Sequence, residues 1–105
     1  MKLNPIPIPK RLWMFAEQYD IVKVPDLVFK DNDNGQARFR ENVIKLQDEV
    51  KGWPRSKEQQ EQTFFHELVH LAVSMTNKTK LSDDEVFIDS MASLLHQAFA
   101  TAEYK

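Results

Sequence analysis

The longest apolar pattern in the chain predicts a buried helix in the second half. From Lys57 to Thr76, apolar residues recur at helical spacing and cover nearly every side of the helix. Ser56 followed three residues later by Gln59 forms a capping box, which marks where this helix begins. A helix that is apolar on most sides lies inside a fold. We therefore expect it to be well buried.

A second long helix is predicted near the C-terminus. The polar stretch Asn77–Leu81 interrupts the first pattern, and Ser82 followed by Glu85 forms another capping box. The helix that begins there is expected to end at about Ala102. Two long helices should therefore make up most of the second half of the chain.

The N-terminal region carries shorter patterns. Residues 1–9 form a proline-rich arm, and the segment 10–19 that follows is predicted to be a short amphipathic helix. The apolar residues at helical intervals in this segment are Leu12, Phe15, Ala16 and Tyr19.

Three short strands are expected between this first helix and the long one. Residues 27–29 predict one strand, the polar stretch 31–35 predicts a turn, and Ala37 to Leu46 alternates enough for two more strands. Residues 48–55 are expected to form a loop. The predicted fold is α+β: a short N-terminal helix, a small three-stranded antiparallel sheet and two long helices, in a single domain over residues 1–105.

The composition is that of an ordinary globular protein. Of the 105 residues, 42% are hydrophobic and 29% are charged. The absence of cysteine excludes a disulfide scaffold, a thiolate metal site and a cysteine nucleophile. The prolines near the N-terminus interrupt any secretory signal, and no apolar run reaches transmembrane length. We therefore expect a cytoplasmic protein without a membrane partner.

The charge pattern bears on partners and on cations. The net charge of −2 argues against a broad nucleic-acid interface, so no nucleic-acid partner is expected. Residues 1–57 hold eleven Lys or Arg against eight Asp or Glu, whereas residues 58–105 hold three against eight. The acidic second half is where a cation would lie.

The first long helix contains the motif HExxH at residues 66–70. Histidines at positions i and i+4 lie on the same helix face, so both imidazoles reach one ion at about 2.0 to 2.1 Å. Glu67 turns toward the same cleft, where it can take a proton from a metal-activated water and pass it to a leaving amine. The motif predicts one catalytic Zn²⁺ with His66 and His70 as ligands and Glu67 as general base.

A buried helix whose two histidines make only local hydrogen bonds would show the same motif. The flanking positions favour the metal site, because they resemble the extended zincin signature. Thr63 stands three residues before the first histidine, Leu68 and Val69 are uncharged, and Leu71 and Ala72 are apolar.

A catalytic zinc site needs a third protein ligand from elsewhere in the chain. The second long helix offers Glu85 and Asp89, with Asp84 as a further candidate. The spacing E-x-x-x-D over 85–89 resembles the gluzincins, in which a glutamate ligand is followed four residues later by an aspartate. This resemblance implies that Glu85 is the third ligand and that Asp89 orients a zinc-binding histidine. Helix capping alone is the alternative role for Glu85.

The resemblance covers about Gly35 to Phe99. A strand pair ahead of a capped QQEQTFFHELVH helix, followed by the EVFID helix, resembles the minimal single-domain gluzincins, or minigluzincins. The ImmA/IrrE-like metallopeptidases of phages and mobile elements share much of this arrangement, but their usual E-x-x-A-N-x-F-A type run is EVFIDSMA here. In gluzincins an edge strand lies antiparallel to the substrate above the zinc, which implies that role for residues 37–40 or 42–46.

Other polar residues receive weaker assignments. His96 lies eleven residues beyond Glu85, about 16 Å along a straight helix, so we expect a partly buried helix histidine and not a further ligand. Oxyanion stabilisation needs a donor near the metal. The candidates, none of which stands out, are Tyr19, Arg38, Arg40, His96 and Tyr104.

These features together predict a zinc-dependent endopeptidase that hydrolyses bonds in a peptide or protein substrate. The alternative is a binding or regulatory module that retains the zinc site and has little or no catalysis. A DNA-binding protein with an incidental motif would need a basic helix, which the second half lacks. The sequence leaves the substrate and the oligomeric state open.

Overall fold

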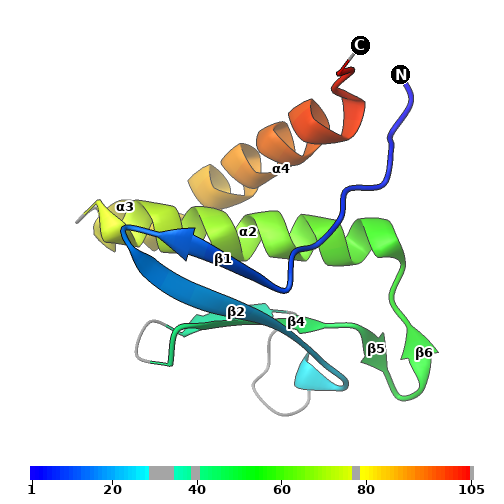
Figure 1. Cartoon of the computed structure of the whole chain (residues 1–105), viewed down its shortest axis with the longest axis horizontal. Helices are drawn as coiled ribbons and strands as arrows, with labels where there is room; N and C mark the ends of the chain where they lie inside the picture. Colours follow the sequence, from blue (N-terminus) through cyan, green and yellow to red (C-terminus); the bar gives the residue numbers. More distant parts are fainter. Residues whose placement is uncertain (29–34, 39–40, 77–78, 105) are drawn as a thin grey trace.

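The chain folds as a small sheet with one long helix packed against it and a second long helix packed against the first. The computed structural model describes residues 1–28, 35–38, 41–76 and 79–104. Figure 1 shows the sheet on one side of α2 and α4 on the other. The predicted α+β class is therefore confirmed. The elements are β1 (Arg11–Met14), β2 (Glu17–Val24), β3 (Gly35–Arg38), β4 (Val43–Gln47), β5 (Glu49–Val50), β6 (Trp53–Pro54), α2 (Lys57–Met75), α3 (Thr79–Ser82) and α4 (Glu85–Thr101).

The helix predicted over residues 10–19 is wrong, because this segment forms the hairpin β1–β2. Its turn consists of Phe15 and Ala16, with φ of 49° and 63°. Two successive left-handed residues are typical of a type I′ turn, which Asn-Gly usually provides. Tyr19 is buried, but Phe15 is 74% exposed and contributes nothing to a helical stripe. The apolar spacing of this segment fitted both a helix and a strand, and the turn residues carried no turn signal in the sequence.

The strands form one mixed sheet in the order β1-β2-β4-β3. β2 and β4 run parallel, while the outer pairs are antiparallel. The predicted three-stranded antiparallel sheet is therefore wrong in strand number and in the direction of the central pair. Parallel strands need a crossover connection, and here the connection from β2 to β4 includes the edge strand β3.

The remaining predictions for the first half were partly right. The two strands expected within residues 37–46 correspond to β3 and β4. Leu27 and Val28 are helical instead of extended, and Phe29 and the predicted turn at 31–34 lie outside the described residues. The loop expected at 48–55 contains the small hairpin β5–β6.

α2 lies at the centre of the core. Its predicted capping box is confirmed: Gln59 N donates to Ser56 Oγ at 3.1 Å, and Ser56 N donates to Gln59 Oε1 at 2.9 Å. A helix with buried residues around most of its circumference must be covered on several sides. Its buried residues are Glu61, Thr63, Phe64, Phe65, Glu67, Val69 and Leu71.

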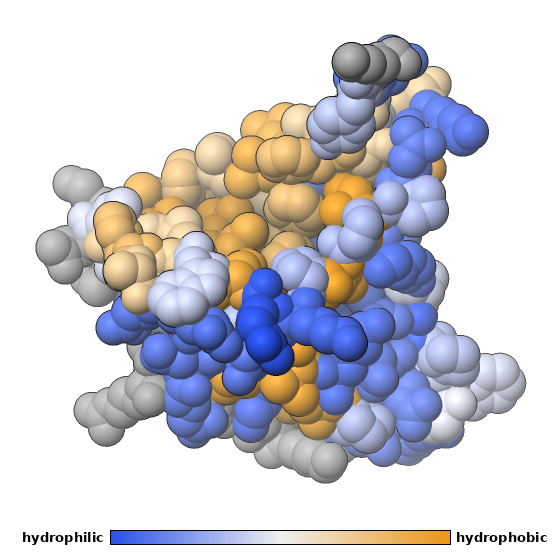
Figure 2. Space-filling view, in the orientation of Figure 1, coloured by the Kyte–Doolittle hydropathy of each residue, from blue (hydrophilic) through white to orange (hydrophobic). Residues whose placement is uncertain are grey.

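α4 contributes one face to the core and exposes another. Ile88 and Ala92 are 0% and 5% exposed, whereas Val86 and Leu94 are 78% and 62% exposed. Figure 2 shows a largely hydrophobic surface over α4 and a hydrophilic one over the strands. Within the part of the chain that the structure describes, no helix combines the length and the apolar character that crossing a membrane requires.

A buried polar pair joins α2 to α4. His96 Nε2 lies 3.0 Å from Glu61 Oε1, and the two residues are 4% and 3% exposed. Phe65 packs edge-on against the His96 ring, with ring centres 5.6 Å apart. His96 is thus a structural histidine, as expected, and it is more completely buried than predicted.

Removal of one member of this pair is expected to destabilise the fold. Glu61→Leu leaves the His96 imidazole buried without its acidic partner, and we expect the free energy of unfolding to fall by about 3 to 5 kcal/mol. The double variant Glu61→Leu/His96→Phe removes both polar groups and should recover much of the loss. Urea denaturation followed by circular dichroism measures both effects. A single variant as stable as the wild type would contradict this role.

Candidate metal centre

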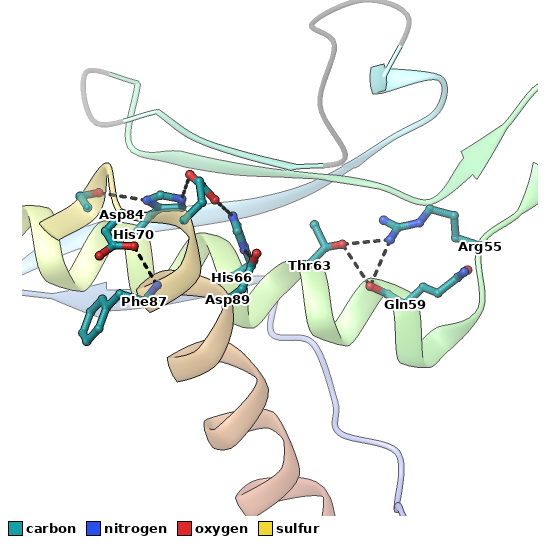
Figure 3. Close-up of polar contacts among 10 residues, drawn as sticks. Arg55, Gln59, Thr63, His66, His70, Asp84, Phe87 and Asp89 are labelled. Atoms are coloured by element: carbon teal, nitrogen blue, oxygen red, sulfur yellow. Dashed lines mark hydrogen bonds and ion pairs between the residues drawn. The ribbon is translucent and has the colours of Figure 1, made fainter. Parts of the chain in front are cut away.

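Two histidines of α2 converge on one carboxylate at the start of α4. His66 Nε2 lies 3.4 Å from Glu85 Oε2, and His70 Nε2 lies 3.2 Å from Glu85 Oε1. Figure 3 shows the labelled His66 and His70 imidazoles, each joined by a dashed line to an acidic side chain that lies between them. Donor atoms of the three residues lie within 4.8 Å of one another, and no other such group of histidine and acidic residues occurs among the described residues. The residues that the sequence predicted as ligands therefore come together.

The start of α4 explains how Glu85 reaches the histidines. The predicted capping box of Ser82 and Glu85 is wrong, because Asp84 is the N-cap and its Oδ1 accepts a hydrogen bond from Phe87 N at 3.1 Å. Glu85 is then the first residue of the helix. Its side chain takes no part in capping and instead turns back toward α2. Asp84, the further candidate ligand, is used as the cap.

Each histidine is also held at its second ring nitrogen. His66 Nδ1 lies 2.8 Å from Asp89 Oδ1, and His70 Nδ1 lies 3.0 Å from Ser82 Oγ. Ser74 Oγ donates to the same Ser82 oxygen at 3.1 Å. A partner at Nδ1 fixes the ring and leaves the Nε2 lone pair for a metal. Asp89 lies where the resemblance placed it, whereas Ser82 was missed because it appeared to be a helix cap.

The separations are compatible with three ligands of one metal ion. Charge-assisted N–H···O bonds are about 2.7 to 2.9 Å long, as is the 2.8 Å contact of His66 with Asp89. Ligand atoms about 2.0 to 2.1 Å from a tetrahedral zinc ion lie about 3.3 Å apart. The separations of the histidines from Glu85, 3.2 and 3.4 Å, are close to this value. Two imidazoles and one carboxylate also form a donor set that catalytic zinc takes.

A cavity of about 320 Å³ adjoins the cluster and is walled by β3, α2 and α4. The His66 and His70 side chains are 26% and 21% exposed, so small molecules can reach them. Glu67 is only 6% exposed and lines the cavity beside His66. A carboxylate in this position can exchange a proton with a molecule bound in the cavity.

β3 approaches α2 closely because residue 35 is glycine. A Cβ atom on Gly35 would lie 2.6 Å from Thr63 Cγ2 and 3.0 Å from Glu67 Cγ. Neither distance is tolerated without movement of the neighbouring atoms. The start of the edge strand therefore lies directly against the proposed general base.

Arg55 fastens the sheet to α2. Its Nη1 donates to the carbonyl oxygen of Gln47 at 3.1 Å, and its Nη2 donates to Thr63 Oγ1 at 3.0 Å and to the carbonyl oxygen of Gln59 at 3.3 Å. Figure 3 shows the bonds to Thr63 and Gln59. Burial lowers the pKa of the Arg55 guanidinium, which still stays charged at neutral pH. These bonds fix the end of β4 relative to Thr63, and with it the position of β3.

The described candidates for oxyanion stabilisation do not line the cavity. Tyr19 is 2% exposed in the core, where burial raises the pKa of its hydroxyl, and Tyr104 is 77% exposed near the C-terminus. His96 is committed to its buried acidic partner. The side chains of Arg38 and Arg40 lie outside the described part of the chain.

No model of a protein family matches this chain, and comparisons with curated proteins and with solved structures found no match either. The gluzincin resemblance therefore rests on the motif residues and on their arrangement. Membership of that family stays a prediction.

Loss of the Ser82 hydroxyl is expected to weaken metal binding. Ser82→Ala removes the group that holds His70 Nδ1, and we expect the zinc affinity to fall by about tenfold, the lower end of such effects. Ser90→Ala deletes the same group from an exposed position of α4 and is the control. Competition with a chromophoric chelator measures both constants. Equal affinities in the two variants would show that Ser82 does not position the histidine.

A methyl group at residue 35 is expected to force the edge strand away from α2. Gly35→Ala should lower the free energy of unfolding by about 1 to 3 kcal/mol through overpacking. Thr63→Ser removes the Cγ2 atom of the closest contact and keeps the hydroxyl that Arg55 binds. The double variant should therefore recover stability in thermal melts, whereas equal loss in the single and double variants would contradict the close approach.

Proposed function

We propose that this protein is a zinc-dependent metallopeptidase with a minimal, gluzincin-like catalytic domain. The observation that supports it best is the convergence of both histidine Nε2 atoms on the Glu85 carboxylate, with the buried Glu67 on the adjoining cavity wall. A purely structural role for the two histidines would not require a third, exposed acidic side chain between them.

In this proposal His66, His70 and Glu85 hold one zinc ion, while Asp89 and Ser82 hold the two imidazoles from behind. When bound, zinc polarises the scissile carbonyl group and lowers the pKa of the attacking water. As ligands the histidines would bind through Nε2, with the ring proton on Nδ1 facing Asp89 or Ser82.

Glu67 moves the proton. It accepts a proton from the water that attacks the carbonyl carbon and then donates it to the amine nitrogen. The C–N bond breaks, which leaves one new carboxylate and one new amine. Its position in a largely buried wall keeps bulk water from competing for that proton.

The edge strand offers a means of holding the substrate. β3 is the last strand of the sheet on the side of the cavity, and Gly35 brings it against Glu67. An extended peptide can add to such an edge through main-chain hydrogen bonds. The gluzincin resemblance implies an antiparallel orientation for that peptide.

Replacement of the general base tests the mechanism. Glu67→Gln keeps the shape of the side chain but cannot accept the proton, and we expect peptide hydrolysis to fall by about 10² to 10⁴-fold. The zinc content, measured by mass spectrometry of the metal, should stay near one ion per chain. Glu17→Gln, at an exposed position of the β1–β2 hairpin, makes the same change away from the site.

The substrate for this test is a mixture of random-sequence peptides analysed by mass spectrometry. Unchanged turnover in the Glu67 variant would rule out this base. Zinc binding by a wild type that cleaves no peptide would favour the binding or regulatory module instead.

A further inference from the structure

The cavity beside Glu67 continues along the groove between α2 and α4. A second cavity, of about 210 Å³, adjoins it, since Gln62 and Ser93 line both. The two helices run antiparallel. His66 of α2 meets Asp89 of α4 at one end, and Glu61 of α2 meets His96 of α4 further along. The groove thus leads from the candidate metal centre toward the N-terminal arm.

Two stripes of polar residues, one on α2 and one on α4, line this groove. Glu58, Gln62 and His66 lie four residues apart on α2, and each lines one or both cavities. Positions four residues apart on a helix lie about 6 Å apart along its axis. Side chains on one side of an extended peptide recur about every 6.6 Å. A peptide lying along the groove would therefore place alternate side chains in the two cavities.

The first cavity does not favour a bulky hydrophobic side chain. Beyond the metal centre its lining includes Ala92 and the uncharged polar residues Gln62, Thr63 and Ser93. Among the residues that the structure describes, no large apolar side chain takes part in this lining, so a bulky hydrophobic residue would gain little by burial there.

The second cavity has the chemistry of a site for a long cation. Met1 and Leu3 supply apolar surface, Gln97 supplies a side-chain amide, and Glu58 supplies a negative charge. Lysine and arginine bury an aliphatic stem against apolar surface and keep a charged head near an acid. Among the described residues, no Lys or Arg lines either cavity.

The N-terminal arm is fixed in place as the wall of this cavity. Asn4 N donates to the carbonyl oxygen of Ala100 at 2.8 Å, and Gln97 Nε2 donates to Met1 Sδ at 2.9 Å. Ile6 and Ile8 pack against the core. The apolar surface that Met1 and Leu3 offer is therefore part of the folded structure.

We propose that the groove between α2 and α4 is a substrate subsite that selects a lysine or arginine two residues away from the residue that occupies the first cavity at the scissile bond. Glu58 determines the preference for the basic residue. This inference rests on the proposed peptidase function, since the groove is assigned to the same substrate.

Cleavage of a peptide library tests the proposal. Wild-type protein loaded with zinc is incubated with random-sequence peptides, and the cleaved sites are identified by mass spectrometry. We expect Lys and Arg to be enriched roughly two- to fivefold at the second residue beyond the one in the first cavity, as suits an exposed ion pair. Glu58→Gln should abolish the enrichment, Glu58→Lys should convert it to a preference for Asp or Glu, and Glu17→Gln should leave it unchanged.

A binding measurement separates this subsite from the catalytic proposal. Zinc-loaded Glu67→Gln protein is titrated with fluorescent peptides that carry Lys, Gln or Glu at the selected position. Tighter binding of the Lys peptide that depends on Glu58 supports the subsite even if the wild type hydrolyses nothing. Hydrolysis or binding that is indifferent to the Glu58 variants overturns the subsite and leaves the peptidase proposal intact. Absence of both peptide binding and hydrolysis overturns the two together.

Discussion

The enclosure of α2 between the sheet and α4 is the constraint on which the rest of the structure depends. Leu71 of α2 is fully buried, as are Ile44 of β4 and Ile88 of α4, and all three belong to one hydrophobic core. Each residue turns an α-helix by about 100°, so a shift of one position would carry His66 and His70 into the core. The apolar packing that stabilises the fold therefore also fixes the direction in which the face with His66 and His70 points.

The sequence predicted what depends on local pattern. The HExxH spacing and the capping box of Ser56 specify a helix and its histidine face without reference to other elements, and both were found. Glu85 was predicted as the third ligand through a family spacing, and the structure places it beside both histidines. The role of Ser82 was not predicted, because the helix could be capped either at Ser82 or at Asp84. Only the tertiary contact of Ser82 with His70 decides between these two caps.

The errors concern features that depend on contacts between distant segments. The hairpin turn at Phe15 and Ala16 adopts left-handed backbone angles without glycine or asparagine, so its sequence resembles a helix as much as a turn. The parallel pairing of β2 with β4 joins residues more than twenty positions apart and leaves no local trace. Even so, the site survives these errors, because its polar groups come from the helices α2, α3 and α4, and Gly35 is what the described part of the sheet contributes to the cavity wall.

α4 shows how one helix register serves both the core and the site. Its buried positions recur every four residues and form one stripe: Ile88, Ala92, His96 and Ala100. The neighbouring stripe, one position further along the helix or three positions back, is exposed and polar: Glu85, Asp89, Ser93 and Gln97. Since both stripes belong to one rigid helix, burial of the first stripe holds the second against the groove. The exposed acids at the histidines need no tight packing of their own, because Ile88, fully buried between them, sets their direction.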